Sequence, residues 1–366
     1  MEVINQLLPQ YKGILKDQDT ITQYGLKLLN TLVEIDPRLV VSLTKYGITS
    51  HLMEYFQTKH LHNGLHSVKL IASIARSSTP PDYTVLRVLC QHSLIPTVCV
   101  LLRHWYKESK EWFFQPLLEI IHCVLLAATG RKEDQQGNVA SVSVSPQAQK
   151  PLLEATEGLS ETVNLIMELC IVGTRSVKTS VRKPALVQIG FNSINPSRQR
   201  TGAGGESSLN SSMSAEVRLL ATSVLKMLVE LYPGVQASIL SQANIARFGA
   251  GLAYSTRRVA YARSKGFAGP ANFHDGRVQS NLLDVMWQSI CTDSKKEQAL
   301  AAYCMKTPSL IRIIQDVAQK SSKAADVSAQ KRAGAVVGLL LKRMRGGGAT
   351  GSGPGSARRV SRGSSR

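Results

Sequence analysis

The chain has 366 residues and a formal net charge of +19, with 43% hydrophobic and 5% aromatic residues. Its longest apolar runs, such as Leu117 to Ala128, are shorter than the roughly 18 to 20 residues that cross a bilayer, so no membrane span is expected. The first ten residues contain Glu2 and Pro9 and lack the charged and then apolar pattern of a secretory signal. These features favour a cytoplasmic protein with either two ordinary domains or one elongated array.

Apolar residues at steps of three and four predict a helix over 21–35, which ends at Asp36-Pro37 because the residue before proline is pushed out of helical geometry. The segment 112–128 is apolar nearly all round, which is typical of a central helix. The same periodicity predicts further helices over 38–45, 48–56, 64–75, 82–92, 95–106, 159–172, 215–231, 236–254, 278–292, 295–305, 309–319 and 325–344. No alternating pattern long enough for a strand is present.

Three polar stretches interrupt this helical pattern, at 129–150, 174–214 and 255–279. We expect them to be loop insertions, the first of them mobile. Residues 345–366 are rich in Gly, Ser and Arg and are expected to form a disordered basic tail. The apolar pattern starts at Val3 without a polar capping unit, so the chain is expected to be the C-terminal part of a longer protein or a truncated gene model.

A short motif recurs five times, in which a small or turn-forming residue precedes an apolar helix. The residues before each apolar start are numbered 47, 93, 158, 244 and 309. When the three polar stretches are left out, the intervals become 46, 43, 45 and 40 residues. A period of roughly 40 to 47 residues is typical of armadillo and HEAT helical arrays.

The chain resembles the armadillo-type superfamily in Tyr46-Gly47-Ile48 to Phe56 and in Ser93-Leu94-Ile95-Pro96 to Leu102. This resemblance implies an all-α, right-handed solenoid of about five to six repeats over residues 1–344. It also implies a non-catalytic scaffold for protein partners. Armadillo proteins that hold an extended peptide carry an asparagine near the end of each long helix, and those positions here are Thr31, Ser73, Cys123, Met227 and Ser289. We therefore carry over the fold but not that binding mechanism.

A weaker resemblance is to the helical C-terminal region of Fused-like and unc-51-like protein kinases. It rests on the stretch from Gln23 to Leu29 followed by the Asp36-Pro37 turn. The chain contains no HRD or DFG motif, so it would be a regulatory segment whose kinase domain lies elsewhere. This kinship implies association with the cytoskeleton or the cilium.

Catalytic and metal-binding patterns are weak. His60, His62 and His66 form the one histidine cluster, but no acidic or cysteine ligand lies beside them, and a solvated loop is the simpler interpretation. The six cysteines lie in apolar helical patterns, too widely spaced for paired metal motifs, which predicts reduced core thiols. We expect no cofactor, no metal and no enzymatic activity.

The strongest functional signal is the charge of two insertions, because residues 151–366 hold 29 Lys and Arg against 13 Asp and Glu. Both 174–214 and 255–279 fall between a middle and a long helix of adjacent units, so they would share one edge. Aromatic residues are interleaved with the cations, which suits an acidic protein partner, or alternatively microtubule tails or RNA. The alternative is that both insertions are solvated, partly disordered loops that bind no partner. The candidate binding residues are Arg182, Lys183, Arg198, Arg200, Arg257, Arg258, Arg263 and Lys265.

The tail adds a second basic element. Arg358-Arg359-Val360 precedes Ser361 in the pattern of a basophilic kinase substrate, and a phosphate there would remove nearly two units of positive charge. Neither the oligomeric state nor the identity of the partner follows from the sequence.

Overall fold

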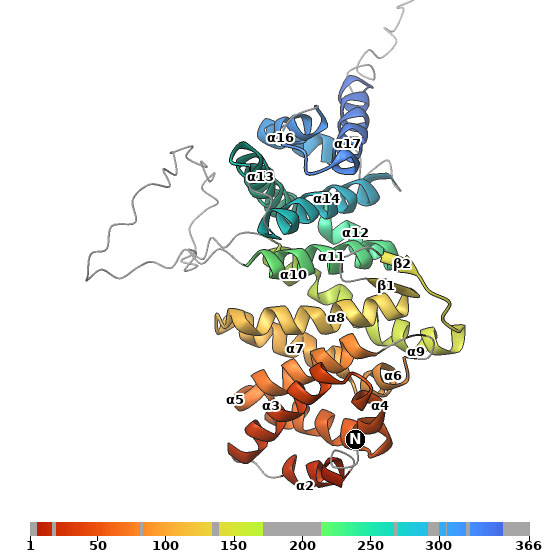
Figure 1. Ribbon diagram of the computed structural model, residues 1–366. Coiled ribbons are helices and arrows are strands. Elements are labelled where there is room, and N and C mark those ends of the chain that lie inside the picture. The colour runs from red at the N-terminus through yellow and green to blue at the C-terminus, as the bar shows by residue number, and fades with distance from the viewer. Residues whose placement is uncertain are drawn as a thin grey trace, which may run out of the picture.

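The chain stacks its helices into an elongated α-solenoid (Figure 1). The computed structural model describes residues 6–16, 20–78, 80, 83–133, 139–170, 214–266, 270–291, 300–304, 306–319 and 323–346. The third and fourth units each have two shorter helices followed by a longer one, as the spacing of the sequence motif predicts. The expected all-α solenoid is therefore confirmed.

The elements follow the chain from one end of the stack to the other. The first unit contains η1 (Leu8–Gln10), α2 (Tyr11–Ile14) and α3 (Thr20–Ile35), and the second contains α4 (Leu39–Lys45) and α5 (Ile48–Ser77). The third contains α6 (Thr84–Gln91), α7 (Leu94–Lys107), η2 (Glu111–Phe113) and α8 (Phe114–Ala128). The fourth contains β1 (Arg131–Glu133), β2 (Val139–Ser141), α9 (Pro146–Thr156), η3 (Glu157–Thr162), α10 (Val163–Leu169) and α11 (Ala215–Leu231). The last two contain α12 (Pro233–Ile239), α13 (Gln242–Ser264), α14 (Pro270–Cys291), α16 (Pro308–Ala318) and α17 (Val327–Gly346).

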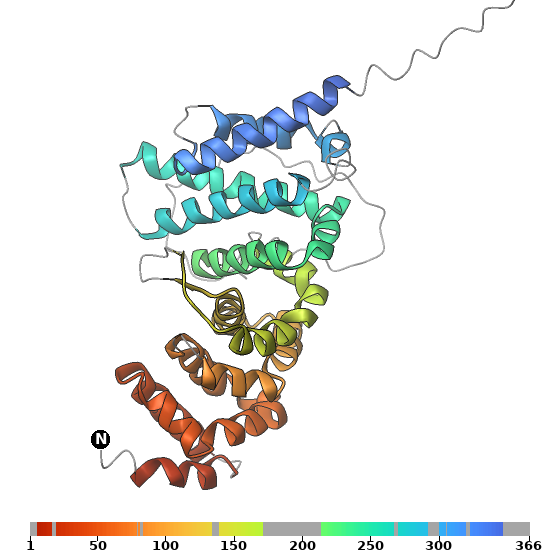
Figure 2. The ribbon, with the colours of Figure 1, turned by 90° about the vertical axis from the view of Figure 1, so that its right-hand side faces the viewer.

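The long helices form one continuous layer. Helix α3 packs on α5, and α8, α11, α14 and α17 follow, each against the one before it. Figure 2 shows α11, α14 and α17 lying one above another when the molecule is turned by 90°. Because each unit contacts chiefly its neighbours, the stability of the stack depends on these unit-to-unit contacts.

Local sequence explains where many helices start. Gly47 precedes α5 with φ of +68°, a left-handed conformation that glycine adopts without strain, and Ser93 takes φ of +60° before α7. The side chains of Ser145, Ser214 and Ser241 accept a hydrogen bond from the backbone N–H three residues further on, and so cap α9, α11 and α13.

Helix α5 corrects two sequence predictions. The helices expected over 48–56 and 64–75 are one continuous helix, and the loop expected around His60, His62 and His66 is helical. The N-terminal half of α5 serves as the middle helix of its unit, and its C-terminal half packs between α3 and α8. Packing on both sides stabilises the helix through its polar centre, which local periodicity does not reveal.

Two of the three stretches that were expected to be loop insertions contain regular secondary structure. Residues 131–133 and 139–141 form an antiparallel hairpin, and α9 already begins at Pro146. The stretch 255–279 is mostly helical, because α13 runs to Ser264 and α14 starts at Pro270. The middle and long helices of this unit are simply longer than the repeat requires. The third stretch, 174–214, lies outside the described residues except for Ser214, as does the tail from residue 347.

The core is a continuous apolar cluster from Leu8 to Leu340. Among the described residues, five free cysteines lie within it or at its margin, and burial raises their thiol pKa values, to about 12 for Cys90 and about 11 for Cys99. One described stretch, Glu111–Ala128, is long and apolar enough to cross a membrane, but 72% of it is buried inside the protein, as in the core helix of a solenoid.

Candidate functional site

Of the predicted basic residues of the second insertion, Arg257, Arg258 and Arg263 lie on helix α13, and Lys265 is its C-cap residue. Arg257, Tyr261 and Lys265 are exposed and recur every four residues, so they share one face of the helix, and the Tyr261 side chain is 45% exposed. Within the described part of the chain, neither Arg257 nor Lys265 forms an ion pair with a carboxylate. We call these three residues the α13 stripe.

The other two predicted cations on α13 have internal partners. Arg258 Nε lies 3.1 Å from Asp275 Oδ2, and Arg263 Nη2 donates to the carbonyl of Ala325 at 2.7 Å. Asp275 is only 1% exposed and also accepts a hydrogen bond from the buried Arg218 at 2.8 Å. Arg258 therefore joins the two helices of its own unit, although it remains 44% exposed, and Arg263 reaches the next unit.

The described contacts place the starts of the long helices along one edge. Ser214, just before α11, lines the same cavity as Glu111 and Trp112, just before α8. Further along the stack, Glu216 lies 3.7 Å from His274, and Ser280 donates to Asp326 at 3.2 Å. The expected binding residues Arg182, Lys183, Arg198 and Arg200, and the expected phosphorylation site Ser361, lie outside the described residues.

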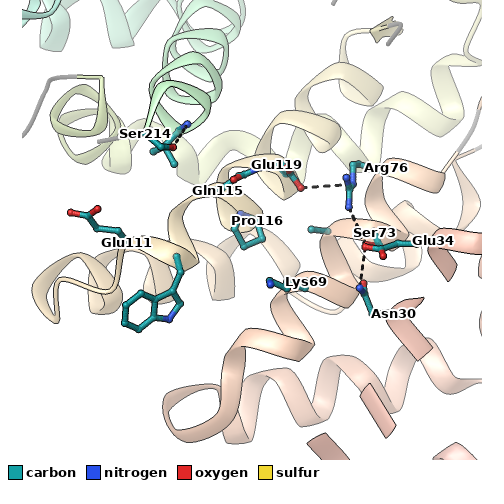
Figure 3. A pocket seen from close by; sticks show the side chains of 13 residues that line it. Asn30, Glu34, Lys69, Ser73, Arg76, Glu111, Gln115, Pro116, Glu119 and Ser214 are labelled. Atoms are coloured by element: carbon teal, nitrogen blue, oxygen red, sulfur yellow. Dashed lines mark hydrogen bonds and ion pairs between the residues drawn. The ribbon is translucent and has the colours of Figure 1, made fainter. Parts of the chain in front are cut away.

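A cavity of about 650 Å³ opens between the first three long helices and the start of α11 (Figure 3). Helix α3 supplies Asn30 and Glu34, α5 supplies Lys69, Ser73 and Arg76, and the start of α8 supplies Gln115 and Glu119. The Arg76 guanidinium lies between two carboxylates, 3.9 Å from Glu34 and 3.8 Å from Glu119. Sequence reasoning missed this cavity, because its lining residues come from helices far apart in the chain.

The β1–β2 hairpin bridges long helices that are not neighbours in the stack. Glu133 accepts a hydrogen bond from Arg277 of α14 at 2.7 Å and lies 3.5 Å from His122 of α8. Arg131 on the same strand pairs with Glu230 of α11, the helix between them. The hairpin therefore fastens three consecutive long helices together.

His122 should make the stability of the protein sensitive to acid. Burial lowers the pKa of His122, Glu133 raises it by a smaller amount and Arg277 lowers it further. The folded state therefore holds this ring neutral at a pH where the unfolded chain, with a pKa of ~6.5, already binds a proton. Because the unfolded state binds more protons, the free energy of unfolding is expected to fall below about pH 6.5, by at most ~1.4 kcal/mol per pH unit for this group.

Urea unfolding between pH 5 and pH 8 would measure this slope. A His122→Gln variant should show a shallower slope rather than a flat one, because burial also lowers the pKa of His66. An unchanged slope in the variant would contradict the assignment.

The described residues show no arrangement typical of catalysis. No group of three or more His, Cys, Asp and Glu side chains in this part of the chain is placed to hold a metal ion. The cysteine thiols described have raised pKa values because they are buried, which makes them poor nucleophiles.

Comparisons with known proteins give one partial sequence match and two solved structures of similar helical content. No family model matches the chain. A 134-residue stretch is 27% identical to the serine/threonine-protein kinase RUNKEL of Arabidopsis thaliana, and it covers 37% of this chain and 10% of that protein. The matched stretch is thus a tenth of the relative's length.

Two solved structures are similar in shape. A designed armadillo repeat protein superposes with a TM-score of 0.48 and 15% identity, covering 91% of this chain and 99% of its own. An engineered protein superposes with a TM-score of 0.46 and 10% identity, covering 92% of this chain and 96% of its own. The geometry described above, a continuous layer of long helices with shorter helices beside it, is the deciding observation. The chain is an α-solenoid.

Proposed function

We propose that this armadillo-like solenoid is a non-catalytic scaffold that binds an acidic protein partner through the α13 stripe. The observation that carries the proposal is the difference among the four cations predicted on α13. Arg258 and Arg263 bond to other segments of the stack, whereas Arg257 and Lys265 lie on one exposed face with Tyr261 between them. Aromatic and arginine side chains are enriched at protein interfaces, and cations along a surface steer an acidic partner toward it.

The expected basic residues of the 174–214 insertion belong to the same proposal. That segment joins α10 to α11, and α10 packs against α13. Its cations Arg182, Lys183, Arg198 and Arg200 would extend the positive surface beyond the stripe. The excess of Lys and Arg over Asp and Glu in residues 151–366 supports this extension.

Reversing the two unpaired cations tests the proposal. We expect the double variant Arg257→Glu and Lys265→Glu to bind a fluorescein-labelled poly-L-glutamate of ~20 residues at least ~10-fold more weakly than the unmodified protein, because surface charge pairs each contribute up to ~1 kcal/mol. Fluorescence anisotropy at low and high salt measures the affinity, and binding should weaken as salt rises.

The matched control reverses Lys45 and Lys132, two exposed lysines away from α13, and so makes the same change in net charge. If both double variants lose affinity equally, the effect is one of net charge and the α13 stripe is not the binding surface. A single-stranded RNA that binds the stripe more tightly than poly-L-glutamate would contradict the protein partner and favour the polyanion alternative.

A second candidate rests on the partial match to RUNKEL. In that case the solenoid would be a regulatory region within a longer kinase polypeptide. The location of that longer protein, expected from the sequence to be cytoplasmic and associated with the cytoskeleton or cilium, would then also be the location of the solenoid. Sequencing the full-length transcript would test this candidate, because a kinase domain in the same reading frame supports it and its absence removes it.

A further inference from the structure

Helix α3 carries an apolar stripe on its solvent side, at the N-terminal end of the stack (Figure 1). The side chains of Ile21, Tyr24, Leu28 and Ile35 are between 54% and 75% exposed, and Leu32 beside them is partly exposed. None of these five residues is charged. We call them the α3 stripe. A contiguous apolar patch of this kind on a protein surface marks a site of interaction with another macromolecule.

The stripe is separate from the face through which α3 joins the core. Leu26, Leu29 and Val33 are fully buried, and α3 packs on α5. At 3.6 residues per turn the five stripe residues fall within about 80° of the helix circumference, and the buried face lies roughly a third of a turn away from them. Helix α3 is therefore apolar on two faces, of which the stack covers one.

The last long helix, at the opposite end of the stack, has a different outer face. The exposed positions along α17 begin with Val327 and continue with Lys331, Gly334, Gly338 and Lys342. Cations and glycines offer little apolar surface, so α17 has the polar outer face that a terminal unit of a solenoid normally has. The uncovered apolar face is therefore a property of α3 and not of both ends.

The spacing of the α3 stripe is symmetric about Leu28, because the intervals between its residues are 3, 4, 4 and 3. A second α3 that runs antiparallel, related by a two-fold axis at Leu28, would set Ile21 opposite Ile35 and Tyr24 opposite Leu32. Leu28 would then lie opposite Leu28 of the other copy. A two-fold interface requires a surface that is complementary to itself, and the stripe meets this requirement along its whole length.

We propose that two copies of this chain associate through their α3 stripes, antiparallel, about a two-fold axis beside Leu28. A single pair of helices buries less surface than the roughly 1,200 to 2,000 Å² of a standard interface, so the dimer is weak, with a Kd on the order of 10 µM. This surface is independent of the α13 stripe, because it lies in the first unit and is apolar instead of basic.

Sedimentation equilibrium of the full chain tests the proposal. From about 1 to about 300 µM, we expect the weight-average mass to rise from that of one chain toward that of two. Leu28→Glu should weaken the dimer at least ~30-fold, because it sets two carboxylates against each other at the axis. Val100→Glu on α7 is the matched control, since Val100 is 53% exposed against 54% for Leu28, and it should leave the equilibrium unchanged.

Mixed variants distinguish a lost contact from misfolding. Leu28→Glu and Leu28→Lys should each be monomeric alone and should form a dimer with each other, because opposite charges then meet at the axis. For the orientation, Ile21→Cys should form a disulfide with Ile35→Cys on a second chain. Two Ile21→Cys chains should not cross-link, because an antiparallel pair holds these positions about 21 Å apart along the axis.

Two results would overturn the proposal. A chain that stays monomeric at ~300 µM would leave the α3 stripe to a different helical segment, and a dimer that Leu28→Glu does not weaken would form through another surface. The Arg257→Glu and Lys265→Glu variant should form the dimer normally. Failure of this proposal is therefore distinguishable from failure of the binding proposed for the α13 stripe.

Discussion

Replacing Asp275 by alanine is expected to destabilise the protein by about 3–5 kcal/mol. Asp275 is 1% exposed and compensates Arg218, which is itself 4% exposed and lies against the ring of Tyr254 at 4.6 Å. Removing the carboxylate leaves the guanidinium of Arg218 buried without its counter-charge, and an uncompensated buried charge is among the most destabilising changes in a protein. The lost contact joins α11 to α14, so the fourth and fifth units should separate more easily.

Urea unfolding followed by circular dichroism measures this effect. Arg258→Ala is the matched control, because it removes the other partner of Asp275 but leaves the buried pair with Arg218 intact. Arg258 is 44% exposed, so its loss should cost no more than ~1 kcal/mol. Similar losses of stability in the two variants would contradict a larger contribution from the buried pair of Arg218 and Asp275.

Replacing Phe114 by alanine is the second change with a large expected effect, again about 3–5 kcal/mol. Phe114 is fully buried at the first residue of α8, the most completely buried of the long helices, and its ring centre lies 6.2 Å from that of Tyr106. Truncation removes the apolar contacts of the ring and leaves a cavity that the stacked helices on both sides cannot close by a local shift.

Trp112→Ala, two residues earlier, provides the comparison at an exposed aromatic residue. We expect it to cost less than ~1 kcal/mol of stability, because most of its side chain already contacts solvent. Thermal unfolding of both variants measures the difference. If Trp112→Ala were as destabilising as Phe114→Ala, Trp112 would be a packing residue rather than a surface available to a ligand.

Local sequence signals predicted the repeat well, and the reasons lie in particular residues. Gly47 and Ser93 mark real helix starts because the backbone there takes positive φ values, and Asp36-Pro37 marks a real helix end. The helix expected over 215–231 is α11 with the same bounds. In each case a glycine, proline or serine cap fixes the boundary within a few residues along the chain.

The candidate site was predicted less well. Arg257 and Lys265 lie on an exposed face, as the charge pattern indicates, but Arg257 belongs to helix α13 and Lys265 to its C-cap, not to a long loop. Arg258 and Arg263 look the same as Arg257 in the sequence, yet they pair with Asp275 and Ala325, 17 and 62 residues further along the chain. The polar residues that line the cavity come from α3, α5 and α8, and no local pattern connects Glu34, Arg76 and Glu119.

The sequence by itself determined that this protein is a stack of amphipathic helices with an uneven positive charge, because helical periodicity, capping residues and composition act over a few residues. The tertiary structure decided that Arg258 and Arg263 bond to other segments of the stack, whereas Arg257 and Lys265 remain exposed. It also decided that α5 continues through its polar centre and that a cavity forms between α3, α5 and α8. These outcomes depend on contacts between residues tens of positions apart, whose energies exceed local preferences and leave no periodic trace in the sequence.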